Sequence, residues 1–463
     1  MLFSSMTFLW AFLPFVFMGC VLMKPKYQNV FLMVASLIFY AWGEPSYIVL
    51  IILSIIINWI LGLTIEKFSD KRKVFLILAI IFDLAILGYY KYYGFLTESI
   101  NSLFNRNIFP TVEISLPIGI SFFTFQIMSY IIDLYRGNYK AQRNIVNLAL
   151  YISFFPQLIA GPIVKYKDIN EQIEHRTMTI EKTACGLRRF TYGLGKKVLI
   201  SNVLAECVDS IYSLNIEEIG TAAAWIAAIL YTLQIYYDFS GYSDMAIGLG
   251  KMFGFDFLEN FNYPYLSCSI HEFWQRWHIS LGTWFKEYVY IPLGGNRKGK
   301  VRTYVNLAIV FLLTGLWHGA SWNYVFWGAY HGFFQIIERL GLEQKLKKIK
   351  FINHIYTFLV VVIGWVFFRV DDFVLALRLV VRMVMPWRHP LPWTYDGSNR
   401  VYLVVILAVL GCGFIQALFH RCKKIARIWK NSLLELVLCI SILLLSFVSL
   451  ASNTYNPFIY FRF

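Results

Sequence analysis

The sequence predicts an all-α, polytopic integral membrane protein. Of its 463 residues, 58% are hydrophobic and only 15% are charged, whereas soluble domains carry about 25% charged residues. The mean hydropathy is +0.57, and aromatic residues reach 18% of the chain, which suits aromatic belts at two membrane interfaces. Apolar runs that cross or nearly cross about 30 Å of hydrocarbon recur along the chain. No Ser/Gly-rich linker divides them, so we expect one membrane domain over residues 1–463.

The apolar runs predict about 11 or 12 membrane helices, with re-entrant and interfacial helices between them. They lie near residues 5–23, 27–42, 47–64, 74–90, 114–135, 198–213, 221–238, 303–318, 321–339, 353–370, 401–419 and 433–451. Lys and Arg outnumber Asp and Glu by 42 to 27 and gather in short loops, which is a topology signal and does not indicate nucleic-acid binding. Basic loops after the first, third and fifth runs, and around residues 421–427, predict that both termini lie outside the cytoplasm.

One apolar stretch, residues 146–163, breaks this alternation because both of its flanks are basic. Arg143 precedes it, and a longer basic set follows it: Lys165, Lys167, Arg188, Arg189, Lys196 and Lys197. Pro156 and Pro162 interrupt its helical pattern. We therefore expect a re-entrant segment, since irregular backbone at membrane depth is tolerated where it lines protein or a watery cavity. An ordinary span kinked by proline is the alternative.

His318 lies at the tip of a predicted hairpin whose two ends are basic. Sixteen residues of helix from Arg302 rise about 24 Å, which leaves His318 inside the membrane, toward its outer half. Ionisable groups at that depth are costly and usually serve a function or face a cavity. Gly315 and Gly319 leave room beside it for substrate or for close backbone. The alternative is a structural His that bonds a carbonyl at a helix turn, and both interpretations stand at this point.

A second cluster contains His271 and His278, which are seven residues apart and would share one face of a helix. Glu272 and Arg276 form an i,i+4 pair of favourable polarity. For most of this cluster we expect an amphipathic helix at the cytoplasmic interface, and His278 is the exception with a candidate function. The zinc motif of two His residues four apart around a Glu is absent, so no metal is predicted.

A third polar group, Asp238 and Asp244, interrupts an apolar run. At membrane depth these carboxylates need partners. They could orient an imidazole or hold acceptor hydroxyls, but such groups more often pair with Arg, which is what we expect for Asp244.

The chemistry open to a buried His is limited. A neutral imidazole can take the proton from an acceptor hydroxyl as that hydroxyl attacks a thioester carbonyl. No Gly-x-Ser-x-Gly elbow, catalytic Cys setting or phosphate-binding Gly loop occurs in the chain. Direct acyl transfer is therefore simpler than a covalent enzyme intermediate.

Two elements together, Phe-Trp-Gln-Arg-Trp-His ending at His278 and Leu-Trp-His-Gly around His318, carry a family resemblance. The chain resembles the membrane-bound O-acyltransferase (MBOAT) family, in its AlgI-like branch of bacterial polysaccharide and peptidoglycan O-acetyltransferases. The segments that carry the resemblance are residues 154–162, 236–248, 260–295, 313–332, 367–369 and 458–463.

The resemblance implies that His318 is the catalytic His and that His278 is the second motif His. We also expect substrate contacts from Trp317, Trp277, Arg276, Asp238 and Asn323. The implied fold surrounds a central tunnel with a cytoplasmic donor side and an outer funnel, in a bacterial cytoplasmic (inner) membrane. No tightly bound cofactor is implied, and acetyl-CoA or another acyl thioester would be the donor.

The implied partners are membrane lipid, a polysaccharide acceptor and an extracytoplasmic SGNH-type acyltransferase that completes transfer. Three alternatives stay open. D-alanyl transfer to teichoic acid would use the same mechanism. A transporter or flippase would explain the spans and the intramembrane carboxylates but not the two Trp-His elements. A non-catalytic scaffold would make the acyl-transfer residues incidental.

Overall fold

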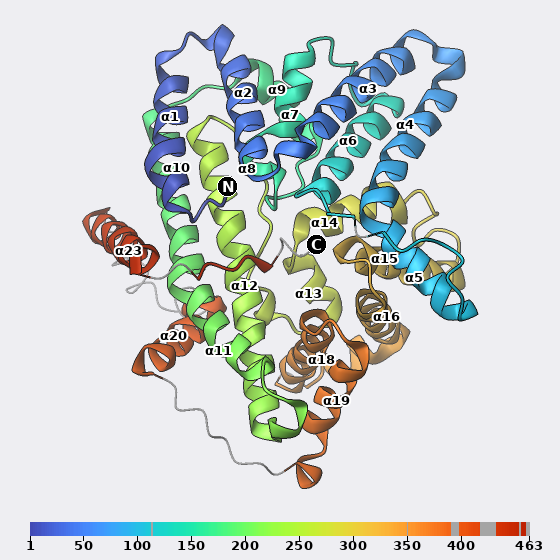
Figure 1. Ribbon diagram of the computed structural model, residues 1–463, viewed down its shortest axis with the longest axis vertical. Coiled ribbons are helices and arrows are strands. Elements are labelled where there is room, and N and C mark those ends of the chain that lie inside the picture. The colour runs from blue at the N-terminus through green and yellow to red at the C-terminus, as the bar shows by residue number, and fades with distance from the viewer. Residues whose placement is uncertain (113, 350, 390–397, 417–431, 453–454, 460–463) are drawn as a thin grey trace. The chain divides into compact units, whose positions relative to one another are not determined.

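A computed structural model describes residues 1–112, 114–349, 351–389, 398–416, 432–452 and 455–459 (Figure 1). Within these ranges the chain is helical and contains no strand, which confirms the all-α class. Five helical stretches are long and apolar enough to cross a membrane: Pro45–Lys67, Ser69–Phe104, Lys300–His318, Ile352–Arg369 and Leu433–Ser452. Shorter apolar helices occupy Phe8–Leu22, Ile120–Tyr135 and Asn399–Phe414. The polytopic character is thereby confirmed, while the number of about 11 or 12 spans and the central tunnel stay predictions.

The chain packs as two compact units. Unit 1 comprises Met1–Phe190 and Ser243–Leu258, and unit 2 comprises Thr191–Tyr242 and Glu259–Phe463. Two helices contribute residues to both units, α10 (Ile180–Gly195) and α12 (Thr221–Met252). The single domain expected from the sequence stays a prediction.

Unit 1 is built from the helices of the N-terminal half. They are η1 (Phe8–Phe12), α1 (Leu13–Leu22), α2 (Pro25–Gly43), η2 (Pro45–Tyr47), α3 (Ile48–Lys67), η3 (Ser69–Lys71), α4 (Arg72–Leu87), η4 (Gly88–Tyr92), α5 (Tyr93–Phe104), α6 (Ile120–Tyr135), α7 (Ile145–Ser153), α8 (Phe155–Leu158) and α9 (Tyr166–His175). Helix α4 packs on α3 and α6, and α7 packs on α2. Asp244 lies 2.8 Å from the Arg189 guanidinium, which confirms the expected Arg partner.

The predicted interruption of residues 146–163 is confirmed. Helix α7 has nine residues and rises about 14 Å, short of a crossing. It ends at Phe154, whose ψ of 113° leaves the helical region, and Pro156 then sits in the first turn of α8. The whole stretch from 147 to 166 is buried, which is the condition under which irregular backbone is tolerated at membrane depth. That both ends lie on one side of the membrane stays a prediction.

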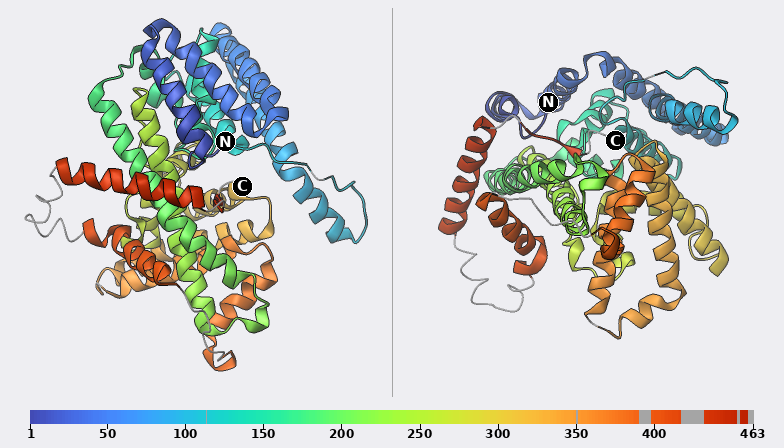
Figure 2. Two further views of the ribbon diagram at one scale, coloured as in Figure 1. Left: turned by 60° about the vertical axis from the view of Figure 1, so that its left-hand side comes forward. Right: turned by 60° about the horizontal axis from the view of Figure 1, so that its bottom comes forward.

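Unit 2 holds both Trp-His elements. Its helices are η5 (Lys196–Ser201), α11 (Asn202–Tyr212), η6 (Ile216–Glu218), η7 (Pro264–Leu266), α13 (Ile270–Arg276), α14 (Ile279–Phe285), η8 (Lys286–Tyr290), α15 (Lys300–His318), α16 (Trp322–Ile337), η9 (Glu338–Leu342), α17 (Glu343–Leu346), α18 (Ile352–Arg369), α19 (Phe373–Val384), η10 (Pro386–Arg388), α20 (Asn399–Val409), η11 (Leu410–Phe414) and α23 (Ser432–Ser452). Helices α15 and α16 form the expected hairpin, and α18 packs on α16. Helices α20 and α23 lie against η5 (Figure 2).

The exposed surface of these helices is apolar. On α23, for example, Leu433, Leu436, Val437 and Leu444 are exposed. Such a surface is unfavourable in water and favourable in lipid. The basic loop at 421–427, the end of the run 401–419 and residues 460–463 lie outside the described residues.

Candidate active site

Two glycines bring the backbones of α15 and α16 together beside His318. A Cβ on Gly315 would lie 2.2 Å from the backbone oxygen of Tyr324, and a Cβ on Gly328 would lie 2.3 Å from that of Phe311. Small residues at such positions allow membrane helices to pack at short range. A Cβ on Gly319 would meet the Tyr324 ring at 2.2 Å. Of the two uses expected for Gly315 and Gly319, the structure shows close packing and not room for substrate.

His318 is the last residue of α15 and is 1% exposed. Aromatic rings surround its imidazole: the centroid of Trp317 lies at 5.0 Å, that of Trp327 at 5.1 Å and that of Phe368 at 5.3 Å. All three meet it edge to face, with interplanar angles of 76° to 87°. The rings restrict where the imidazole can point and keep bulk water from it.

His278 is the second imidazole of the cluster. Its ring centroid lies 6.3 Å from that of His318, and Trp317 contacts both rings, at 5.7 Å from His278. The residue joins α13 to α14 with a φ of 48°, a left-handed conformation that is uncommon outside Gly and Asn. Strain of this kind is found where the surrounding structure imposes it, often at functional sites. The two Trp-His elements, 40 residues apart in sequence, therefore meet in one cluster.

A buried amide sets the hydrogen position on His278. Asn260 is fully buried, and its Oδ1 accepts the backbone N–H of Ser280 at 3.1 Å and the Ser280 hydroxyl at 2.9 Å. Because that backbone N–H can only donate, the Asn260 atom is the oxygen. Nδ1 of His278, 3.2 Å away, therefore donates to it. Burial lowers the pKa of His278 to about 3, so the ring is neutral at neutral pH. Its lone pair is then on Nε2.

His271 and His278 do not share a helix face, contrary to the sequence-based expectation. Helix α13 ends at Arg276, and the left-handed turn at His278 redirects the chain. The His271 ring instead contacts Gln335 and Gln275. Helix α13 is amphipathic, with Ile270 and Phe273 buried and Gln275 exposed. Its expected place at the cytoplasmic interface stays a prediction.

The predicted substrate-binding residues have different surroundings. Trp317 is the one that contacts both imidazoles. Trp277 packs on Trp365 at 4.9 Å and on Phe261 at 5.0 Å, within the aromatic core.

Arg276 and Asn323 hold parts of the backbone. Arg276 pairs with Glu272 at 2.8 Å, as expected from the i,i+4 spacing, and donates to the carbonyl of Asn262. Asn323 donates to the carbonyl of Val370 and so ties the start of α16 to the end of α18. Substrate binding by these four residues stays a prediction.

Asp238 is buried in an ion pair with Lys197. Its second carboxylate oxygen accepts the backbone N–H of Ile459 at 2.9 Å, and Lys197 also donates to the carbonyl of Pro457. Phe458, between them, stacks on Tyr242 with ring centroids 4.6 Å apart. Asp238 therefore anchors residues 457–459, and its expected role toward an imidazole or acceptor hydroxyl stays a prediction. Lys197 is 1% exposed, so it is not one of the loop charges counted after residue 163.

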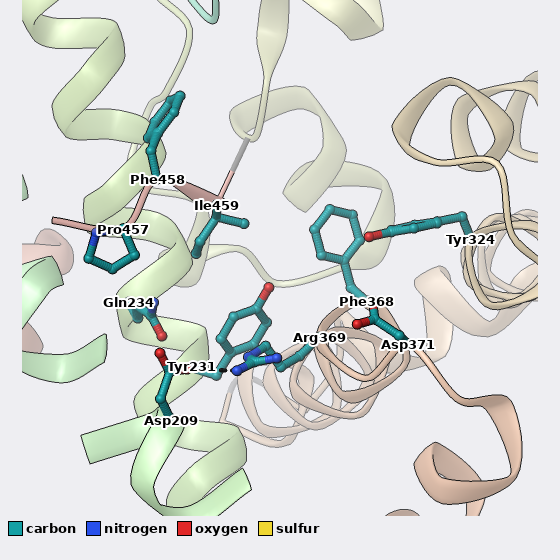
Figure 3. Close-up of a pocket in the computed structure, with 10 residues that line it drawn as sticks. All are labelled: Asp209, Tyr231, Gln234, Tyr324, Phe368, Arg369, Asp371, Pro457, Phe458 and Ile459. Carbon is teal, nitrogen blue, oxygen red and sulfur yellow. Dashed lines mark hydrogen bonds and ion pairs between the residues drawn. The ribbon is translucent and has the colours of Figure 1, made fainter. Parts of the chain in front are cut away.

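A small pocket with both polar and apolar lining residues lies beside this cluster (Figure 3). It is lined by Asp209, Tyr231, Gln234, Tyr324, Phe368, Arg369, Asp371, Pro457, Phe458 and Ile459. Arg369 pairs with Asp209 at 2.6 Å, and the Tyr455 hydroxyl donates to the same carboxylate. Phe368 lies between the pocket and His318, because its ring lines the pocket and also contacts the His318 ring.

Sequence reasoning missed several members of this site. His331 is fully buried between Trp274 and Trp327, with ring centroids at 5.1 and 5.0 Å. It lies within a predicted span, and an ionisable residue in an apolar run could have signalled it. The pocket carboxylate Asp209, within the predicted span 198–213, carried the same signal. Asn260 had no comparable signal, because only folding brings it to the cluster.

Comparison with known proteins identifies the family. A model of MBOAT, the membrane-bound O-acyltransferase family, matches residues 138–367. The chain is 40% identical to the probable alginate O-acetylase AlgI of Pseudomonas putida, over 100% of both chains. It is 35% identical to the peptidoglycan O-acetyltransferase of Helicobacter pylori, over 83% of this chain and 80% of that protein. It is 28% identical to the teichoic acid D-alanyltransferase of Bacillus subtilis, over 51% of this chain and 65% of that one. From these matches and the meeting of both Trp-His elements in one buried cluster, the chain belongs to the membrane-bound O-acyltransferase family and is an O-acyltransferase.

Proposed function

We propose that this O-acyltransferase moves an acetyl group from an acyl thioester on the cytoplasmic side to a hydroxyl on the extracytoplasmic side. The observation that carries the proposal is the pair of buried imidazoles, His318 and His278, beside this pocket. The donor is acetyl-CoA or another acyl thioester, and the scheme needs no tightly bound cofactor.

The chemistry follows from the ring nitrogens. His318 accepts the proton of the acceptor hydroxyl as the hydroxyl oxygen bonds to the acyl carbon, and the carbon–sulfur bond breaks. The proton then passes to the departing sulfur, so none is gained or lost overall. We assign the base to His318 because it lies next to the pocket, with the Phe368 ring between the two. His278, with its lone pair on Nε2, orients the second substrate or the base.

The basic ends of the hairpin support a cytoplasmic donor. Arg297, Lys298, Lys300 and Arg302 lie at the start of α15, and Lys345, Lys347 and Lys348 follow α16. Helix α15 carries His318 at its other end, after 19 residues that rise about 28 Å. Lys and Arg at the basic end would bind the phosphates of an acyl-CoA.

On the other side we propose a polysaccharide or an extracytoplasmic SGNH-type acyltransferase as the next acceptor. The pocket carboxylates and tyrosines suit a hydroxyl-bearing ligand, since carboxylates accept hydroxyl hydrogen bonds. In this proposal the protein lies in the bacterial inner membrane, with lipid around its exposed apolar helices. Both termini then lie outside the cytoplasm. Acetyl is preferred over D-alanyl because the relatives named as acetylases match at higher identity and coverage.

The test uses purified protein in liposomes with radiolabelled acetyl-CoA and either a candidate polysaccharide or the partner acyltransferase. The His318→Ala variant should lose at least about 10²-fold in label transfer, the scale of general-base catalysis, with an unchanged melting temperature. Equal transfer by a folded His318→Ala variant would refute the assignment. If wild type transfers no label from acetyl-CoA but does so from a carrier-protein thioester, the donor is the carrier-protein thioester.

The second imidazole is tested by a matched pair. His278→Ala should impair transfer more than His271→Ala, because the His271 ring contacts Gln335 and Gln275 and not His318. Both variants are measured in the same transfer assay with their melting temperatures. Equal activity of the two would overturn this ranking.

A further inference from the structure

Phe368 occupies a position between two environments. It is the penultimate residue of α18, next to Arg369, whose guanidinium lies in the pocket. Its ring contacts the His318 ring at 5.3 Å and the Tyr324 ring at 5.2 Å, both edge to face. Figure 3 shows the ring beside the Tyr324 hydroxyl, while the Arg369 side chain points toward Asp209.

The pocket and the imidazole differ in their access to water. The pocket is lined by charged groups, Asp209, Arg369 and Asp371, which favour hydration. His318 is 1% exposed and does not line the pocket. Phe368 is 3% exposed and contacts both.

Water is a competitor in any acyl transfer from a thioester. Its oxygen can bond to the acyl carbon while the carbon–sulfur bond breaks and the proton passes to sulfur, giving a free acid and a thiol. Closed active sites suppress such side reactions by excluding water. A ring that must be displaced before anything in the pocket reaches His318 would have this effect.

We propose that Phe368 is the barrier between the hydrated pocket and the reaction centre, and that it sets the ratio of acyl transfer to donor hydrolysis. The hydrolysis part rests on the proposed function, whereas the barrier part concerns only access to His318. Phe368 is thus a positioning residue that acts by excluding water, and it takes no part in proton transfer.

The neighbouring Phe367 provides a matched control. It is also 3% exposed, on the same turn of α18, but its ring packs on Phe326 at 4.6 Å and on Phe373 at 6.0 Å. Phe367→Ala removes the same number of buried atoms, and the ring contacts of Phe367 do not include His318. A general loosening of α18 would therefore affect both variants alike.

The first measurement needs no donor. Purified wild type, Phe368→Ala and Phe367→Ala are treated with diethyl pyrocarbonate, and modification of His318 is followed by peptide mass spectrometry. We expect His318 to react with the reagent at least about ten-fold faster in Phe368→Ala than in the other two proteins. Removal of the ring exposes an imidazole that burial otherwise protects until the structure opens. Equal rates in all three folded proteins would overturn the barrier.

The second measurement is thiol release from acetyl-CoA without acceptor. Phe368→Ala should raise it, and the ratio of transfer to hydrolysis should fall, while Phe367→Ala leaves that ratio unchanged. If Phe368→Ala does not fold, Phe368→Leu, which is smaller and not planar, should show the same changes to a lesser degree. Faster labelling without any thioester chemistry in wild type would retain the barrier and refute the proposed donor. If wild type releases thiol from acetyl-CoA but His318 is labelled at the same rate in all three proteins, the barrier is refuted and the proposed donor is retained.

Discussion

The amide of Asn260 offers a sharp test of how the site controls its imidazoles. Three hydrogen bonds end on its Oδ1, from the backbone and hydroxyl of Ser280 and from Nδ1 of His278. Asn260→Ala leaves two buried donors, the Ser280 N–H and the His278 Nδ1–H, without this acceptor. At about 1–3 kcal/mol for each unsatisfied group, the free energy of unfolding should fall by roughly 2–6 kcal/mol.

The kinetic effect is separable from this loss of stability. The hydrogen bond from His278 Nδ1–H to Asn260 orients the imidazole and contributes about 1.4 kcal/mol. Its loss should lower kcat about ten-fold. The assay is label transfer at saturating donor, below the melting temperature of the variant. Asn262→Ala is the matched control, because Asn262 is exposed and only its backbone bonds to Arg276.

Asn260→Asp separates geometry from charge. The carboxylate keeps an acceptor for Nδ1–H and Ser280, but it also stabilises a protonated His278. The pKa of His278, lowered by burial in wild type, should therefore rise, and activity should decline at a higher pH than in wild type as the solution is acidified. Wild-type kcat in Asn260→Ala, together with an unshifted acidic limb in Asn260→Asp, would refute the argument and leave Asn260 a purely structural role.

Two further predictions concern stability. Lys197→Met leaves the Asp238 carboxylate buried without its cation, so the free energy of unfolding should fall by about 3–5 kcal/mol. Adding Asp238→Leu should recover most of this loss. A double variant that melts no higher than Lys197→Met would contradict the ion-pair account. Gly315→Ala places a methyl group 2.2 Å from the Tyr324 carbonyl and should lower both melting temperature and transfer by forcing α15 and α16 apart. Gly88→Ala, where a Cβ meets nothing within 4 Å, is its control, and equal melting of the two variants would argue against close helix packing at Gly315.

Local sequence patterns predicted the features that depend on local environment. Composition and the length of the apolar runs indicated membrane helices, because a helix that crosses the hydrocarbon must itself be apolar over that thickness. The break before Pro156 was likewise predicted, since helices usually end at or before the residue that precedes a proline. The depth of His318 in one predicted helix made it a candidate, with a structural His as the alternative, and the expected Arg partner of Asp244 was confirmed.

The arrangement of His278 shows where local patterns fail. A spacing of seven predicts one shared helix face only while the helix continues, and here it ends at Arg276. Hydrogen bonds that Asn260, 18 residues away, accepts then stabilise a left-handed turn that periodicity does not describe. The same limit applies to Lys197, which looked like a loop charge until its partner 41 residues later was seen.

Composition and local pattern were thus enough to predict that this protein lies in a membrane, that it is helical, and that its two Trp-His elements are the candidates for its chemistry. That the two imidazoles meet, that Asp238 binds Lys197 and the segment 457–459, and that a pocket lies behind Phe368 became visible in the folded chain alone. The physical reason is that burial and helix formation depend mainly on neighbouring residues, whereas these contacts join segments far apart in the chain. Their geometry is set by the packing of whole helices on one another.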